Sequence, residues 1–442
     1  MKVSPLRKSV ILLMVIAGLN VALAYLRETV VAYYFGVSGD LDTFLVAVSI
    51  PQIIGTEILG IAVTVLLPTY VSLKAKHGGA AAAARARRWV YGTAAIITAG
   101  AVLVYALAPS ICRLLAPGFT GGQAAKAAEW MRLSTPVMFF LGMSGMSKLV
   151  LDGNRRFFFP ALSRGMGSAA FALACVLLSG RPGGLNLVWA MLASSLVILA
   201  FSSLPLLPGL FSARGEDSTQ VSGPSPEDSR IASLVLIVGA NSLVFHCYSL
   251  IDRGFASTLG AGSIAVLNYG NMLINVTSTL FSMAIATVIF PELSGNFAKG
   301  EHQSSVGMTR KAMRLCAGVY AGAAAVLAGL SRPLVSLLLQ RGRFNPAAAA
   351  SVAAVLSILA VGLVPSGLWD IMRVFFRAQN LHVYLLHAAF IVLVSKIILN
   401  YALLGYGVDG LAMSSSATTW LGYGYLYYRF SRNARELVAL PA

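Results

Sequence analysis

Long runs of apolar residues, separated by short polar stretches, make up nearly the whole chain. A helix needs about 20 apolar residues to cross the hydrocarbon core of a bilayer. With Gly, Pro and charged residues as boundaries, the pattern predicts about 12 transmembrane helices in an all-α integral membrane protein. They lie near 9–36, 41–73, 88–113, 128–152, 156–180, 184–210, 230–259, 263–293, 311–331, 346–376, 381–405 and 408–430.

Composition agrees with a membrane protein and excludes a soluble domain. Of the 442 residues, 57% are hydrophobic and only 11% are charged, whereas a soluble domain carries about 25% charged residues. The net charge of +17 does not indicate nucleic acid, because the basic residues lie in short blocks between apolar runs, as cytoplasmic loops do. We therefore expect no nucleic-acid partner.

The chain lacks the usual signatures of cofactor or covalent chemistry. Its four cysteines are far apart, its histidines have no ligand spacing, and no Walker loop, zinc motif or catalytic triad signature occurs. We expect no enzyme activity, no metal and no cofactor. The energy source is then a coupling monovalent ion or the membrane potential.

The charge of the loops alternates along the chain. The positive-inside rule assigns the basic loops, and with them both termini, to the cytoplasm. The basic residues on that side are Lys2, Arg7, Lys8, Lys74, Lys76, Arg85, Arg87, Arg88, Arg155, Arg156, Lys299, Arg310, Lys311, Arg314, Arg373, Arg377, Arg429, Arg432 and Arg435. The other side has fewer: Arg113, Lys126, Arg181, Arg332, Arg341 and Arg343.

A polar segment rich in Ser, Pro, Gly and acidic residues divides the runs into two sets of six. It predicts an N-terminal lobe at 1–211, a cytoplasmic linker at 212–229 and a C-terminal lobe at 230–442. The two halves resemble each other. "ETVVAYYFG" matches "DRGFASTLG", and "AVTVLLPTY" matches "IATVIFPEL", in the same order and at nearly the same spacing. Six spans per half make this a parallel repeat with a pseudo-twofold axis along the membrane normal, a design that suits alternating access.

Charged residues inside the spans are costly and mark candidate functional positions. Arg27 and Glu28 in the first half correspond to Asp252 and Arg253 in the second. Adjacent helical residues point about 100° apart, so we expect neither pair to be self-contained. At least one member would then seek another helix or a ligand, either as an interhelical salt bridge or as a group that binds an anionic headgroup or relays ions.

Other polar residues extend this candidate set. Asp42 lies at the start of the second run, and Glu57 lies among Pro and Gly residues inside it. Asn271 and Asn275 occur in a similarly interrupted eighth run. Such interruptions permit kinks that expose backbone groups to a cavity, and they also occur as ordinary kinks in packed helices. Three basic residues are interpreted as lying near cytoplasmic ends or snorkelling to them: Lys148, Arg373 and Lys396.

These residues resemble the MurJ/MviN family. "LRETVVAYYFGVSGDLDTFLVAVSIPQ" is similar to the family's opening, and "LIDRGFASTLGAGSIAVLNYGNML" to its seventh and eighth helices. "GRFNPAAAASVAAVLSILAVGLVPSGLWDIMRVFFRAQN" resembles its tenth helix, and "LNYALLGYGVDGLAMSSSATTWLGYGYLYY" its last shared pair. The resemblance implies a flippase of polyprenyl-linked sugars in the bacterial cytoplasmic membrane, with two six-helix lobes in a V around a central cavity.

The resemblance also carries residue roles and departures. Arg27 matches a cavity arginine of the family, and Asp42 matches the acid of its T-D-A-F motif. Two further family arginines are replaced here by Val21 and Met272, which removes donors for a diphosphate. The family usually carries two more helices after the twelfth, where this sequence ends.

The leading hypothesis is a flippase for a polyprenyl-diphosphate-linked sugar, which is lipid II or another envelope or exopolysaccharide precursor. Arg27 and Arg253 would meet phosphate, while Asp42, Glu57 and Asp252 would couple ions or pair with the arginines. Its partners would be the lipid-linked glycan, membrane lipids and envelope-synthesis proteins. Two alternatives are a cation-coupled exporter of drugs or small metabolites and a transport-inactive scaffold. A membrane glycosyltransferase would need a longer outer loop.

Overall fold

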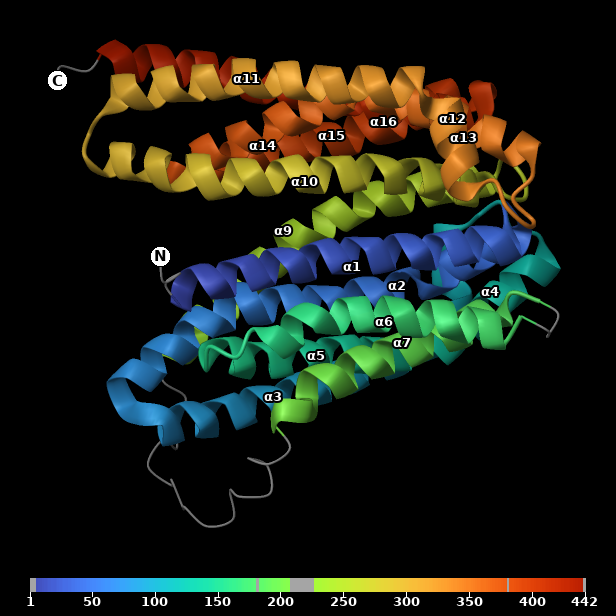
Figure 1. Cartoon of the computed structure of the whole chain (residues 1–442), viewed down its shortest axis with the longest axis horizontal. Coiled ribbons are helices and arrows are strands. Elements are labelled where there is room, and N and C mark those ends of the chain that lie inside the picture. Colours follow the sequence, from blue (N-terminus) through green and yellow to red (C-terminus); the bar gives the residue numbers. More distant parts are fainter. Residues whose placement is uncertain (1–4, 180–182, 207–225, 380, 440–442) are drawn as a thin grey trace. The chain divides into compact units, whose positions relative to one another are not determined.

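The structure is a computed structural model of the 442-residue chain, and it describes residues 5–179, 183–206, 226–379 and 381–439. All regular structure in these ranges is helical (Figure 1). The chain separates into two compact units, Met1–Leu243 and Val244–Ala442. The boundary between them lies within helix α9, Pro226–Ser257. The linker expected at 212–229 falls mostly outside the described residues, and α9 begins inside it.

The first unit is a bundle in which α5 and α6 occupy central positions. Helix α6 packs against α1 and α7, and α5 packs against α2, α3 and α7 (Figure 1). A π-helical turn at Ala62–Leu66 joins α2 to α3 without a gap and contributes Val65 and Leu66 to a buried cluster. The helices of this unit before α9 are α1 (Pro5–Phe35), α2 (Gly39–Ile61), α3 (Leu67–Leu115), α4 (Gly121–Ser134), α5 (Pro136–Gly153), α6 (Phe158–Leu177) and α7 (Leu185–Ser203).

The turn between α1 and α2 shows how the sequence sets a helix boundary. Helix α1 ends at Gly36, whose φ of 56° is a left-handed conformation that glycine adopts at little cost. The Ser38 hydroxyl then accepts a hydrogen bond from the Leu41 amide at 3.3 Å and caps α2. Asp40 and Asp42 follow in the first turn, where their carboxylates complement the positive end of the helix dipole.

The second unit is a bundle of helices that includes one bent pair. Helix α13 is followed after one residue by α14, and the two are bent by 42°. Helix α10 contacts α13 and α14, while α16 packs against α13, α14 and α15. The helices of the second unit after α9 are α10 (Ser263–Ala298), α11 (His302–Gly329), α12 (Ser331–Leu339), α13 (Pro346–Val361), α14 (Leu363–Ala378), α15 (His382–Leu403) and α16 (Gly407–Ala439).

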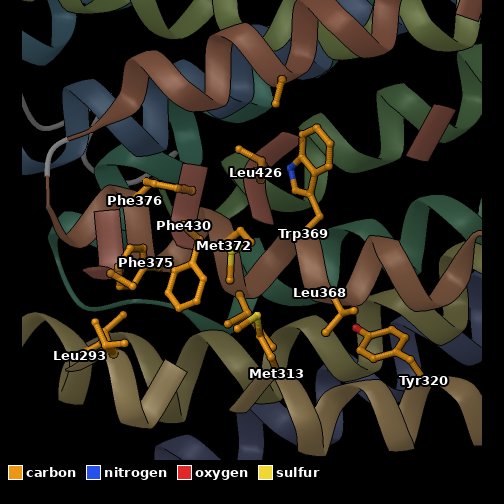
Figure 2. Close-up of a cluster of buried hydrophobic side chains, with 14 of the residues drawn as sticks. Leu293, Met313, Tyr320, Leu368, Trp369, Met372, Phe375, Phe376, Leu426 and Phe430 are labelled. Carbon is orange, nitrogen blue, oxygen red and sulfur yellow. The ribbon is translucent and has the colours of Figure 1, made fainter. Parts of the chain in front are cut away.

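A cluster of aromatic and aliphatic side chains forms the core of the second unit (Figure 2). The rings of Phe375 and Phe376 on α14 meet edge to face, with 5.4 Å between their centroids. Phe430 of α16 lies 4.8 Å from Phe375, again edge to face. Leu293 of α10 and Met313 of α11 belong to the same buried cluster. Such rings bury large apolar areas, so this cluster holds four helices of the unit together.

The helices have the length and composition of membrane spans. Within the described residues, seven helical stretches are long and apolar enough to cross a bilayer, and eight if the bent pair α13 and α14 counts as one span. Large apolar side chains also cover the outside of the bundle, for example Ile96, Leu114 and Phe390, which are all more than half exposed. The predicted all-helical membrane fold is confirmed, although the predicted runs at 128–152 and 346–376 each cover two helices.

Candidate functional site

Arg27 and Glu28 on α1 pair with each other. The Arg27 Nε donates to the Glu28 Oε1 at 3.0 Å, and the guanidinium forms an ion pair with the same oxygen. The expectation that adjacent residues would not close such a pair is wrong here. The arginine side chain is long enough to bend back across the angle between the two positions. The same guanidinium lies 5.5 Å from the Phe171 ring centroid of α6, so the pair is also held against a second helix.

Part of the Arg27–Glu28 pair remains accessible. The Arg27 side chain is 30% exposed and the Glu28 side chain 16% exposed. An anion that reaches this point would therefore find a guanidinium that is oriented by an aromatic ring and neutralised by a single carboxylate. Arginine forks bind phosphate in two-pronged geometry, which makes this pair a candidate anion site.

Asp42 lies buried in the first turn of α2 and is only 1% exposed. Helix α4 fastens this turn, because the Gln123 Nε2 donates to the Gly39 carbonyl and contacts the Thr43 hydroxyl, both at 3.2 Å. Glu57 lies further along α2 and is half-buried. Just before it, Gly55 meets α5 so closely that a Cβ would lie 2.9 Å from the Leu141 Cβ. The two acids are thus in the same helix but far apart along it.

The second unit gathers its charges around Asp252 of α9. The Lys396 Nζ of α15 lies 2.8 Å from the Asp252 Oδ1. The Asn400 Nδ2 donates to the same oxygen at 2.9 Å, and the Ser415 hydroxyl of α16 donates to the Oδ2 at 3.3 Å. The Lys396 ammonium also donates to the Ser415 hydroxyl and lies 4.6 Å from the Tyr248 ring centroid. This cluster joins α9, α15 and α16.

Lys396 corrects an expectation from the sequence. Its side chain is 0% exposed, so it neither snorkels nor lies at an accessible helix end. The reason is its partner, because the ammonium pairs with the buried carboxylate of Asp252 on α9. The other two residues of that set pair within their own helices, Lys148 with Asp152 at 2.6 Å and Arg373 with Asp370 at 3.0 Å.

The remaining expected site residues lie outside this cluster. Arg253 is adjacent to Asp252 on α9 and half-buried. The Asn271 Nδ2 donates to the Leu267 carbonyl of its own helix at 3.0 Å, and Asn275 is exposed. Sequence reasoning missed Asn400 and Ser415. Their signal was the spacing of four between Lys396 and Asn400 in an apolar run, which places both on one helix face.

The described part of the chain holds no group of three or more His, Cys, Asp or Glu side chains that could bind a metal. Its polar chemistry consists instead of guanidinium and ammonium groups paired with carboxylates at membrane depth. Buried charges in spans line substrate or ion pathways in transport proteins. The site therefore has the character of a transporter.

Comparison with solved structures defines the class. The chain resembles a lipid II flippase MurJ in an inward closed conformation, with a TM-score of 0.76 and 19% identity over 97% of this chain and 90% of that one. It also resembles an inward-facing multidrug resistance MATE family transporter of the MOP superfamily, with a TM-score of 0.72 and 14% identity over 97% and 100%. The fold is that of the MOP superfamily transporters.

Sequence comparison gives the family. The family described as "Lipid II flippase MurJ" matches residues 31–439. A lipid II flippase MurJ of Burkholderia cenocepacia is 25% identical over 80% of this chain and 70% of its own length. A probable lipid II flippase MurJ of Thermotoga maritima is 23% identical over 91% and 81%. The chain belongs to the lipid II flippase MurJ family, and it is a membrane transporter of lipid-linked precursors, not an enzyme.

Proposed function

We propose that this protein flips a polyprenyl-diphosphate-linked sugar, lipid II or a related envelope or exopolysaccharide precursor, by alternating access between two six-span lobes. The observation that carries the proposal is a partly exposed arginine, Arg27, held at membrane depth in a chain of this family. A diphosphate is doubly anionic, so an oriented guanidinium in the spans offers it a contact that neither lipid tails nor water-filled space provides.

The backbone conformations of two glycines support the prediction of twelve transmembrane helices. The helical run Gly39–Leu115 holds 77 residues, or about 115 Å of helix, against roughly 30 Å for the hydrocarbon core. Gly78 interrupts it with a φ of 83°, so the run supplies two spans joined at a basic turn. The 56-residue run His382–Leu437 is divided in the same way at Gly407, the first residue of α16, whose φ is 64°. Helices α9 and α10 contribute two more.

The local structure of matched positions supports the internal repeat. Ala32 and Ala256 correspond in the two halves, and both are 0% exposed. Gly36 and Gly260 correspond four residues later, and both have positive φ, 56° and 104°. Gly36 directly follows α1, and Gly260 lies in the loop after α9, three residues beyond its end. Equal burial at the alanines and positive φ at the glycines favour two lobes of common architecture.

Contacts at one end of the first unit support the assignment of two basic stretches to the same side of the membrane. The Lys74 Nζ donates to the Asn154 Oδ1 at 2.6 Å, and the Asn154 Nδ2 donates to the Tyr70 hydroxyl at 3.2 Å. Lys74 belongs to the basic stretch near Gly78, and Asn154 directly precedes Arg155. The two basic stretches thus lie at the same end of the bundle, as the positive-inside rule requires of cytoplasmic loops.

The test is headgroup translocation in proteoliposomes that contain the purified protein and labelled lipids. Lipid II, a polyprenyl-diphosphate monosaccharide and a polyprenyl-monophosphate sugar would be compared in vesicles of the same composition. We expect flipping of one or both diphosphate lipids and much slower flipping of the monophosphate. Well-folded protein that flips none of them would overturn the proposal, and export of cationic drugs would then be measured on the same vesicles.

A further inference from the structure

A buried ion pair in the second unit lies at the centre of a polar cluster that joins three helices. Helix α9 contributes Tyr248 and Asp252, α15 contributes Lys396 and Asn400, and α16 contributes Ser415. Each of the first two pairs has a spacing of four residues, so both members lie on one face of their helix. The sequence predicts that Asp252 couples ions or pairs with an arginine, which makes the identity of its cation the next question.

The Lys396 ammonium is enclosed by the groups that a small monovalent cation would use. It contacts an Asp252 carboxylate oxygen at 2.8 Å, donates to the Ser415 hydroxyl, and faces the Tyr248 ring at 4.6 Å. The three donors of an ammonium are thereby directed at a charged oxygen, a neutral oxygen and an aromatic face. The side chain is 0% exposed, so its position is fully taken up by protein.

The carboxylate is as fully engaged as the ammonium. Asp252 receives Lys396 and Asn400 on Oδ1 and Ser415 on Oδ2. Within the described residues, the buried Asn400 Oδ1 and the buried Ser414 hydroxyl have no hydrogen-bond partner. Without the ammonium, this region would hold a buried negative charge among carboxylate, hydroxyl and amide oxygens. Hard monovalent and divalent cations select that kind of ligand.

We propose that Lys396 is a built-in cation, which occupies the Asp252 site permanently and leaves no room there for an alkali ion from solution. This rests on the proposed transport function and specifies its energy coupling. The second unit then neither binds nor releases a metal cation at Asp252 during the cycle. The membrane potential then supplies the driving force, because it acts on the anionic headgroup as the headgroup moves away from a negative cytoplasm.

The experiment is thermal unfolding of purified protein in nanodiscs, in sodium, lithium, potassium and choline chloride at equal ionic strength. Four proteins are compared: wild type, Lys396→Ala, Asp252→Asn, and the matched control Asp252→Asn/Lys396→Ala, which has the same cavity as Lys396→Ala but no carboxylate. No lipid substrate is present, so the result does not depend on whether the protein flips lipids.

We expect wild type to melt at the same temperature in all four salts. Lys396→Ala gains a cation site, and sodium or lithium raises its melting temperature by about 5 °C over choline. The double variant shows no such shift. Identical melting of Lys396→Ala in every salt would overturn the proposal. So would a wild-type protein that one alkali ion stabilises and whose shift disappears in Asp252→Asn, and this second comparison decides the matter even where Lys396→Ala does not fold.

Discussion

Asp252 of α9 and Lys396 of α15 form an ion pair at 2.8 Å in which the lysine side chain has no solvent exposure. Two charges removed from water in this way stabilise each other only as long as both are present. The pair therefore ties α15 to the first helix of its unit and makes the two residues interdependent.

A double-mutant cycle tests that interdependence. Lys396→Met leaves an uncompensated buried carboxylate and is expected to lower the free energy of unfolding by about 3–5 kcal/mol. Asp252→Asn/Lys396→Met removes both charges and is expected to be more stable than either single variant. Thermal or denaturant unfolding in detergent measures the four proteins. Single losses that simply add in the double variant would show that the two side chains act independently.

The glycines after the first helix of each half give a graded prediction. Gly36 has a φ of 56°, in the left-handed region that asparagine also enters, whereas Gly260 has a φ of 104°, beyond it. No atom lies within 4 Å of a Cβ built on Gly260, so any penalty there comes from the backbone alone. We expect Gly260→Asn to cost about 1–3 kcal/mol, all of it from the backbone. Gly36→Asn carries a smaller backbone cost, but it also places a side chain at a buried position.

The melting temperature of Gly260→Asn, measured beside wild type, checks the backbone cost. Gly79→Asn, at an exposed position with open space around its Cβ and no positive φ, serves as the control. Equal melting temperatures for Gly260→Asn and Gly79→Asn would contradict the backbone argument.

The orientation of the first unit is testable by cysteine labelling. Gly79 and Lys126 are both exposed, and the positive-inside rule assigns them to the cytoplasmic and outer sides. In a cysteine-free background, a membrane-impermeant maleimide is expected to label Lys126→Cys in intact cells. Gly79→Cys is expected to react only after permeabilisation. The reverse pattern would invert the proposed topology.

Most of the fold could be predicted from the sequence because the signals for helices and turns are local. Apolar runs bounded by Gly, Pro and charge correspond to helices, and the turn after Gly36 follows from the glycine and the Ser38 cap. Two local features were not predicted from the sequence. The break at Thr135, between α4 and α5, was signalled by Pro136 at the start of α5, but the π-helical turn at Ala62–Leu66 has no local signal that we recognise.

The candidate site was harder to predict because partners are set by tertiary structure. Asp252 was identified from its cost in a membrane span, but its lysine lies on a helix more than a hundred residues away. Lys396 was judged by its place along an apolar run, and that place does not say which side chains face it. Arg27 and Glu28 were judged by backbone direction alone, which neglects the reach of an arginine side chain.

The most direct test of the account is the initial rate of headgroup flipping for Arg27→Ala, compared with wild type in the same proteoliposomes. Arg132→Ala is the matched control, because Arg132 also lies 5.5 Å from an aromatic ring centroid, that of Tyr105, but outside the proposed site. We expect Arg27→Ala to flip a polyprenyl-diphosphate sugar at least about tenfold more slowly, since a charge-assisted contact to phosphate is worth roughly 1.5–3 kcal/mol. Arg132→Ala is expected to match wild type. Equal rates for a well-folded Arg27→Ala and wild type would contradict the claim that this arginine meets the headgroup.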